Sequence, residues 1–114
     1  MKRFAKSFTH ALNGIRFALK APNVQIQLVV GLITISLGIQ LQISRLDSIA
    51  VLLCIGFVLS AEVSNSAVEE ICNKFHPETH PQIALIKDLA AGSVLIAAIT
   101  AVAIGILIFI PYLR

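Results

Sequence analysis

Residues 89–110 read LAAGSVLIAAITAVAIGILIFI, a stretch without a charged side chain. A helix rises 1.5 Å per residue, so this stretch is long enough to cross the hydrocarbon core of a bilayer, which is about 30 Å thick. The composition agrees: 57% of the 114 residues are hydrophobic and 13% are charged, whereas soluble domains carry about 25% charge. The alternating pattern of membrane-spanning strands is absent, so the sequence predicts an all-α membrane protein.

Two earlier segments are also apolar enough to span the bilayer. Residues 24–43 cover about 30 Å as a helix and keep their glutamines near the two ends, where headgroups and water can satisfy them. Residues 48–72 begin apolar but become polar after Ala61, so this helix is expected to extend beyond the membrane or to carry buried polar groups. We expect residues 1–114 to form one membrane-embedded domain with three transmembrane helices, the third at 89–110.

Residues 2–20 have the pattern of an amphipathic helix. Polar and charged side chains follow the same three- and four-residue steps as the apolar ones, on the opposite side. This spacing predicts a helix that lies in the membrane interface. A signal peptide is the alternative, but its apolar core would be continuous, whereas charges recur throughout this segment. The apolar side chains of the pattern are Phe4, Phe8, Leu12, Ile15 and Leu19.

Positive charge is distributed unevenly along the chain. Seven of the nine Lys and Arg residues belong to the opening segment or to residues 74–88, while Arg45 and Arg114 lie at the opposite ends of the predicted spans. Segments rich in Lys and Arg remain on the cytoplasmic side of a membrane. We therefore expect a multi-pass protein with a cytoplasmic N-terminus.

Glu62, Asn65 and Glu69 form the first polar cluster. Their spacing places them within an arc of about 60° on one helix face, whereas Glu70 points about 80° away from Glu62 and is expected to face solvent. An ionisable side chain at the centre of a membrane helix costs about 2.5–3.5 kcal/mol, which favours a functional explanation. The structural alternative is that Glu62 pairs with Lys87 or Asn65 and only fixes the packing of the helices.

Lys87 and Asp88 form a second cluster just before the third span. We expect Asp88 to cap that helix and Lys87 to point into the interface. Together with the carboxylates of the neighbouring helix, this pair offers the groups that phosphoryl transfer needs: acids for Mg²⁺, a cation for the phosphates and a carboxylate that accepts a hydroxyl proton. Glu78 and His80 are candidates for binding the ribose or base of a nucleotide. No Walker, GxGxxG or HRD motif occurs, which excludes the recognised soluble nucleotide-binding folds.

Three motifs carry a family resemblance: residues 62–69 (EVSNSAVE), 78–80 (ETH) and 87–95 (KDLAAGSVL). Together with residues 3–16 (RFAKSFTHALNGIR), they resemble the small prokaryotic diacylglycerol kinase and undecaprenol kinase family, and the likeness covers nearly the whole chain. The resemblance implies a homotrimer with three transmembrane helices and one interfacial helix per chain. It also implies active sites shared between neighbours at the cytoplasmic surface of a bacterial membrane.

The resemblance also implies a role for each site residue. Glu62 is the expected general base on the lipid hydroxyl, and Glu69 is the expected metal ligand beside ATP. Asn65 supports both, and Lys87 binds the transferable phosphate. The other residues expected to contact the nucleotide are Arg3, Glu78, His80 and Asp88.

The sequence departs from the family pattern at the end of the opening helix. Members of the family usually carry a glutamate there that helps to hold the metal. Here residues 20–23 read KAPN, and no acid precedes Asp47. We therefore expect weaker metal binding, unless Asn23, water or ATP oxygens take that position.

The predicted function is Mg²⁺-ATP-dependent phosphorylation of a membrane lipid alcohol, either undecaprenol or diacylglycerol. The absence of tryptophan, with His10 and Leu12 on the opening helix, differs from the diacylglycerol-specific members and favours undecaprenol. The expected partners are the lipid alcohol, the bilayer and further copies of the chain, with no nucleic acid. The alternatives are an inactive relative and a non-enzymatic transport or scaffolding subunit in which Glu62 is an ion or proton site.

Overall fold

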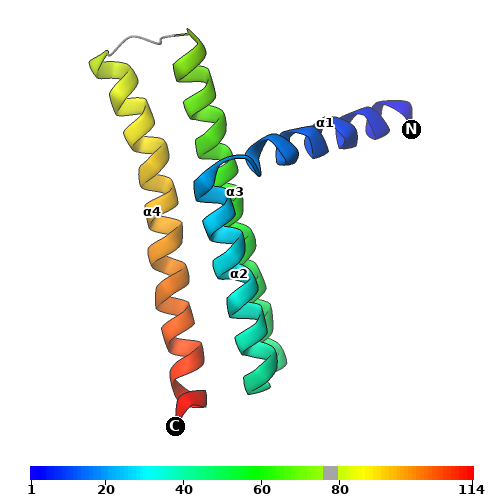
Figure 1. The fold of residues 1–114 in the computed structure, drawn as a ribbon, viewed down its shortest axis with the longest axis vertical. Coiled ribbons are helices and arrows are strands. Elements are labelled where there is room, and N and C mark those ends of the chain that lie inside the picture. The colour runs from blue at the N-terminus through cyan, green and yellow to red at the C-terminus, as the bar shows by residue number, and fades with distance from the viewer. Residues whose placement is uncertain (76–79) are drawn as a thin grey trace.

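The computed structural model describes residues 1–75 and 80–114, and the regular secondary structure in these two ranges is entirely helical. α2, α3 and the continuous segment of α4 and η1 are each long and apolar enough to cross a membrane. The prediction of an all-α membrane protein with three such helices is confirmed (Figure 1). The elements are α1 (Lys2–Ala18), α2 (Pro22–Leu41), α3 (Arg45–Phe75), α4 (Pro81–Phe109) and the short 3-10 helix η1 (Ile110–Leu113).

α2 begins and ends at residues with clear conformational reasons. Pro22 occupies its first turn, where a missing backbone N–H costs no helical hydrogen bond, and Ala21 before it is extended. At the other end Gln42 adopts the left-handed conformation, with φ 52° and ψ 51°, and its N–H bonds back to the last turn. The helix has 20 residues and is therefore about 30 Å long, which matches the hydrocarbon thickness.

α4 begins at Pro81, well before the predicted start of the third span at residue 89. Its N-cap is His80, whose Nδ1 accepts a hydrogen bond of 3.1 Å from the backbone N–H of Gln82. The prediction that Asp88 caps this helix is wrong, because Asp88 lies inside α4. The polar residues before the apolar run continue the helix outward, as the polar end of α3 does.

α3 is the central helix, and both α2 and α4 pack along it (Figure 1). The residues buried at these contacts include Val51, Val58 and Ala97. A Cβ atom added at Gly31 would lie 3.2 Å from Cγ2 of Ile55, so this glycine permits a close approach of α2 to α3. Small and branched side chains provide the van der Waals packing on which helix association in membranes depends.

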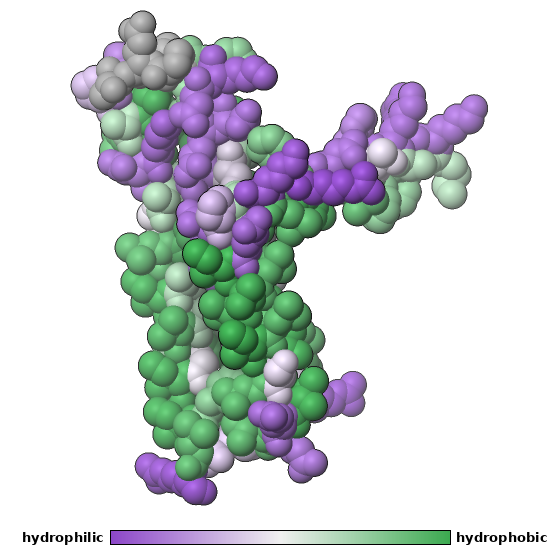
Figure 2. All heavy atoms as spheres, in the orientation of Figure 1, coloured by the Kyte–Doolittle hydropathy of each residue, from purple (hydrophilic) through white to green (hydrophobic). Residues whose placement is uncertain are grey.

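α1 projects away from the other helices, and its N-terminal end lies far from them (Figure 1). Ala18, near its C-terminal end, is its buried residue. Figure 2 shows hydrophilic side chains along one side of α1 and hydrophobic ones along the other. Phe4 and Phe8 are 73% and 60% exposed, so the apolar side has no partner within the described chain. This geometry suits the predicted interfacial position, which stays a prediction.

A small hydrogen-bond network joins the C-terminal segment to the turn between α2 and α3. The hydroxyl of Tyr112 in η1 donates to Asp47 Oδ2 at 3.0 Å and accepts from the backbone N–H of Ser44 at 2.9 Å. Ser44 Oγ accepts from the backbone N–H of Asp47 at 3.1 Å. The far end of α4 is thereby attached to the other two long helices.

Tyr112→Phe is expected to lower the free energy of unfolding by about 1 kcal/mol, since the ring stays while both hydrogen bonds of the hydroxyl are lost. Reversible unfolding in mixed detergent micelles, followed by circular dichroism, measures the change. Ser36→Ala is the matched control, because Ser36 Oγ donates only to the Leu32 carbonyl within its own helix. Equal stability of Tyr112→Phe and the parent protein would show that the network does not anchor α4.

Candidate functional site

The site depends on the greater length of α3. This helix has 31 residues whereas the antiparallel α2 has 20, so one end of α3 extends past the start of α2 (Figure 1). Figure 2 shows hydrophilic side chains gathered on this end and along α1, next to a broad hydrophobic region over the middle of the bundle. The polar part of the predicted second span therefore lies at one end of the bundle, where α1 joins α2.

Glu62, Asn65 and Glu69 follow one another along α3 toward its polar end, so their distance from the apolar part of the helix increases in this order. Glu62 is 5% exposed and Asn65 is 7% exposed, whereas Glu69 is exposed. Asn65 Nδ2 donates to Glu69 Oε1 at 3.0 Å, so these two side chains share a face as predicted. The two carboxylates thus have different surroundings: one is enclosed and the other is open to a ligand from solution.

Asn65 holds an acceptor without a partner. Because its Nδ2 donates to Glu69, its Oδ1 points elsewhere, and this buried oxygen has no hydrogen bond within the described residues. An unpaired buried acceptor costs about 1–3 kcal/mol, so the site has a place for a donor or a cation. The exposed Glu69 carboxylate suits Mg²⁺, which proteins usually bind through one or two carboxylates together with substrate phosphates, and Asn65 Oδ1 would join it if the amide flipped.

The described residues offer few protein ligands to such a metal. They contain no group of three or more His, Cys, Asp or Glu side chains arranged to hold an ion. A magnesium ion at Glu69 would therefore depend on water and phosphate oxygens for most of its coordination. The weaker metal binding expected from the missing N-terminal acid stays a prediction.

Lys87 reaches this face of α3 from α4. Its Nζ donates to Asn73 Oδ1 at 2.7 Å. Asn73 is four residues beyond Glu69 and eleven beyond Glu62, so the ammonium is bound at a level about 6 Å along the helix from Glu69 and about 16 Å from Glu62. Among the described side chains, Lys87 bonds to Asn73, and Asn65 bonds to Glu69. The structural alternative required Lys87 or Asn65 to pair with Glu62, and neither of them does so in this part of the chain.

A polar cavity of about 250 Å³ lies where the junction of α1 and α2 meets α3. Glu69 and Asn73 belong to its wall on α3, and Lys20 belongs to the wall formed by the junction. The cavity therefore combines carboxylate, amide and ammonium groups in a space that a phosphate could enter. Its other lining residues are Phe17, Ala18, Ala21, Ser66 and Glu70.

The remaining predicted nucleotide contacts are not all brought together within one chain. Arg3 lies near the free end of α1, far from α3 (Figure 1). His80 is at the start of α4 with its Nδ1 engaged by Gln82. Asp88 follows Lys87 by one residue and so points about 100° around α4 from it. Glu78 lies outside the described residues.

Asn73 and Lys20 are polar residues of the cavity that sequence reasoning missed. The position of Asn73 could have been predicted from the sequence. Asn73 lies eleven residues after Glu62, which is about three turns of helix, so it returns to the same helix face. The position of Lys20 could not be predicted in this way. Its position opposite α3 depends on how the chain turns between α1 and α2, and helical spacing does not report that turn.

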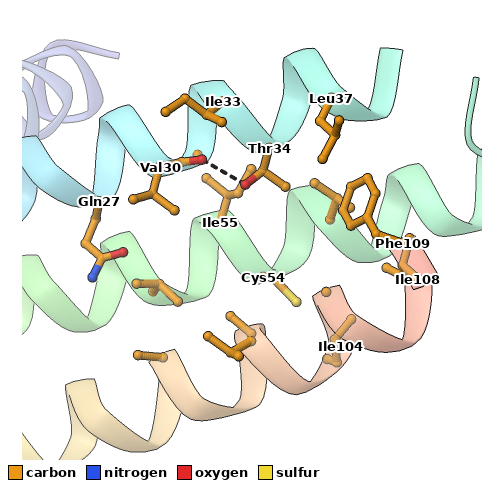
Figure 3. A pocket seen from close by; sticks show the side chains of 17 residues that line it. Gln27, Val30, Ile33, Thr34, Leu37, Cys54, Ile55, Ile104, Ile108 and Phe109 are labelled. Atoms are coloured by element: carbon orange, nitrogen blue, oxygen red, sulfur yellow. Dashed lines mark hydrogen bonds between the residues drawn. The ribbon is translucent and has the colours of Figure 1, made fainter. Parts of the chain in front are cut away.

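An apolar groove of about 440 Å³ lies further along the bundle between α2, α3 and α4 (Figure 3). Thr34 contributes little polarity to it, because its Oγ1 donates to the Val30 carbonyl at 2.8 Å within α2. Cys54 lines the groove among apolar side chains, in agreement with a packing role. Val58 also lines it, one helical turn before Glu62, so the groove approaches the enclosed carboxylate.

Long apolar helices with carboxylates, amides and a lysine gathered at one end define an integral membrane protein with a polar site at the membrane margin. The family model for prokaryotic diacylglycerol kinase matches residues 9–109. A protein named undecaprenol kinase, from Bacillus subtilis (strain 168), is 33% identical over 114 residues, which cover 99% of this chain and 93% of that protein. The chain belongs to the prokaryotic diacylglycerol kinase family and is thus a membrane-embedded lipid kinase.

Proposed function

We propose that this protein transfers the γ-phosphoryl group of ATP to the hydroxyl group of undecaprenol or diacylglycerol. The observation that carries the proposal is the stripe on α3, where an enclosed carboxylate, Glu62, is followed by the bonded pair of Asn65 and Glu69. The apolar groove that approaches Glu62 favours a substrate that arrives from the bilayer. The similarity to a protein named undecaprenol kinase favours undecaprenol as the first alcohol to test.

In the proposed reaction Glu62 accepts the proton of the lipid hydroxyl. The hydroxyl oxygen forms a bond to the γ-phosphorus, and the bond from that phosphorus to the β,γ-bridging oxygen breaks, so ADP leaves. Glu62 suits this role because it lies on the apolar side of the cluster, while Glu69 is exposed beside the polar cavity. A positioned general base contributes about 10²–10⁴-fold to such a reaction.

The nucleotide would occupy the outer part of the same site. Glu69, joined by Asn65 Oδ1 if that amide flipped, would hold Mg²⁺, which when bound neutralises charge on the phosphates. Lys87, bonded to Asn73 on the same end of the bundle, would move to a phosphate oxygen. Asp88, Glu78 and His80 are the proposed contacts to the ribose and base.

The proposed active form is a homotrimer. The cavity of one chain is small and open, and Arg3 is too far along the projecting α1 to reach the α3 of its own chain. A neighbouring copy is the proposed source of the Arg3 contact. Chemical cross-linking of the protein in lipid vesicles, followed by mass measurement, tests this number of chains.

The proposed orientation places the polar end of α3 and the N-terminus in the cytoplasm of a bacterial cell. By their places in the helices, the Lys and Arg residues of α1, with Lys74 and Lys87, belong to this end of the bundle, and Arg45 and Arg114 belong to the other (Figure 1). The positive-inside rule therefore favours a site on the cytoplasmic face, where ATP is present. Selective labelling of single cysteines from outside intact cells tests the orientation.

Transfer of label tests the proposal directly. The protein is reconstituted in phosphatidylcholine vesicles that contain either undecaprenol or diacylglycerol and is incubated with Mg²⁺ and γ-labelled ATP. Label in the lipid phase is expected, with the more rapidly labelled alcohol identified as the preferred substrate. The absence of label with both alcohols, from protein that retains its helical circular dichroism, would reject the proposed reaction.

A further inference from the structure

Lys20 is the one cavity residue with a positive charge on the wall opposite α3. It follows α1 and precedes Pro22, so it belongs to the short junction that joins α1 to α2. Glu69 and Glu70 line the same cavity from α3. The cavity thus has two carboxylates on one wall and an ammonium group on the other.

The ammonium group and the carboxylates do not neutralise one another directly. Within the described ranges, the Lys20 nitrogen forms no ion pair with a carboxylate oxygen at 4.0 Å or less. A free phosphate would be repelled by the carboxylates, and a free metal ion would be repelled by the ammonium group. A metal–phosphate pair fits both walls, because its cation can face Glu69 while its anion faces Lys20.

The backbone at Lys20 is hydrogen-bonded, although its side chain is exposed. The backbone N–H of Lys20 donates to the Phe17 carbonyl at 3.1 Å, and that of Ala21 donates to the Ala18 carbonyl at 3.0 Å. Ala18 and Val24, on either side of the junction, are each 3% exposed. The Lys20 ammonium lies 6.0 Å from the centre of the Phe17 ring, which also lines the cavity. The junction therefore holds the base of this side chain at the cavity wall.

We infer that Lys20 binds a phosphate of the nucleotide directly, from the wall opposite Glu69. This inference rests on the proposed function, since it assumes that the polar cavity receives Mg²⁺ and ATP. It adds a binding residue that belongs to the same chain as Glu69. Lys87 then provides the second cation, from α4.

The test compares Lys20→Met with Lys20→Arg, and uses Lys6→Met as a matched control. Lys6 is an exposed lysine of α1 that does not line the cavity. Each protein is reconstituted in phosphatidylcholine vesicles, and binding of a non-hydrolysable ATP analogue with Mg²⁺ is measured by calorimetry. The kcat and the KM for ATP are measured in parallel with a lipid alcohol as acceptor.

Lys20→Met is expected to weaken analogue binding by about tenfold or more, the loss expected for a hydrogen bond to a charged group. The KM for ATP should rise with it, while kcat changes less. Lys20→Arg should keep most of the affinity, and Lys6→Met should keep all of it. Unchanged binding in Lys20→Met, in a protein that phosphorylates lipid, would overturn the inference and leave the proposed function intact.

The proposed function can also fail while the inference about Lys20 holds. If no lipid alcohol is labelled but analogue binding still depends on Lys20, the cavity is a nucleotide site and the proposed transfer is wrong. If the parent protein neither binds the analogue nor labels a lipid, both are wrong.

Discussion

Glu62→Gln is expected to lower the rate of lipid phosphorylation by about 10²–10⁴-fold, the contribution of a positioned general base. The amide has nearly the same shape as the carboxylate but cannot accept a proton from the lipid hydroxyl. Glu62 is 5% exposed and makes no side-chain hydrogen bond within the described residues, so an uncharged replacement should leave the helices packed. The KM for ATP should change little, because in the proposed site Glu62 contacts the lipid hydroxyl, whereas Glu69 and Lys87 hold the nucleotide.

The measurement is the initial rate of label transfer at saturating ATP and lipid alcohol, with helical circular dichroism recorded for the same samples. Asp47→Asn serves as the comparison, because it removes a carboxylate from the opposite end of the same helix, away from the polar cavity; about a third or more of the parent rate should remain. Wild-type turnover in Glu62→Gln would reject Glu62 as the base. A transport role would instead require ion movement across the vesicle membrane that this substitution stops.

The spans were predictable because their signal is local. The charge-free run at residues 89–110 and the apolar run at residues 24–43 identify membrane helices without any tertiary information. The ends of α3 and α4 were less predictable, since polar residues that leave the membrane can continue a helix equally well. His80 and Pro81 show this: they begin α4 two turns before the apolar run starts.

The site was predictable only where its residues share one helix. Glu62, Asn65 and Glu69 are related by helical spacing, and the hydrogen bond between the last two agrees with that spacing. The link from Lys87 to Asn73 depends on how α4 packs on α3, and the place of Lys20 depends on the turn before α2. Neither relation is encoded in spacing along the chain.

The structure also separates the two carboxylates, which spacing treated as equivalent. The buried position of Glu62 suits a base for a lipid substrate, and the exposure of Glu69 beside the polar cavity suits a ligand for a metal–nucleotide complex. Replacing Glu62 and replacing Glu69 should therefore change different measured quantities. Loss of the base should lower kcat, whereas loss of the metal ligand should alter the dependence on Mg²⁺ as well.

Glu69→Gln is expected to raise the Mg²⁺ concentration needed for half-maximal activity by about 10–100-fold and to lower kcat/KM for ATP at least as much. Glu69 is the open carboxylate that accepts from Asn65 Nδ2, and no cluster of three or more ligating side chains in the described ranges could replace it. Binding of Mn²⁺ with a non-hydrolysable ATP analogue, followed by electron paramagnetic resonance, measures the same loss without turnover. Glu62→Gln is the matched comparison and should keep Mn²⁺ binding while losing activity. If Glu69→Gln and the parent protein bind Mn²⁺ equally, the metal is held elsewhere, and the assignment of Glu69 fails even if activity is low.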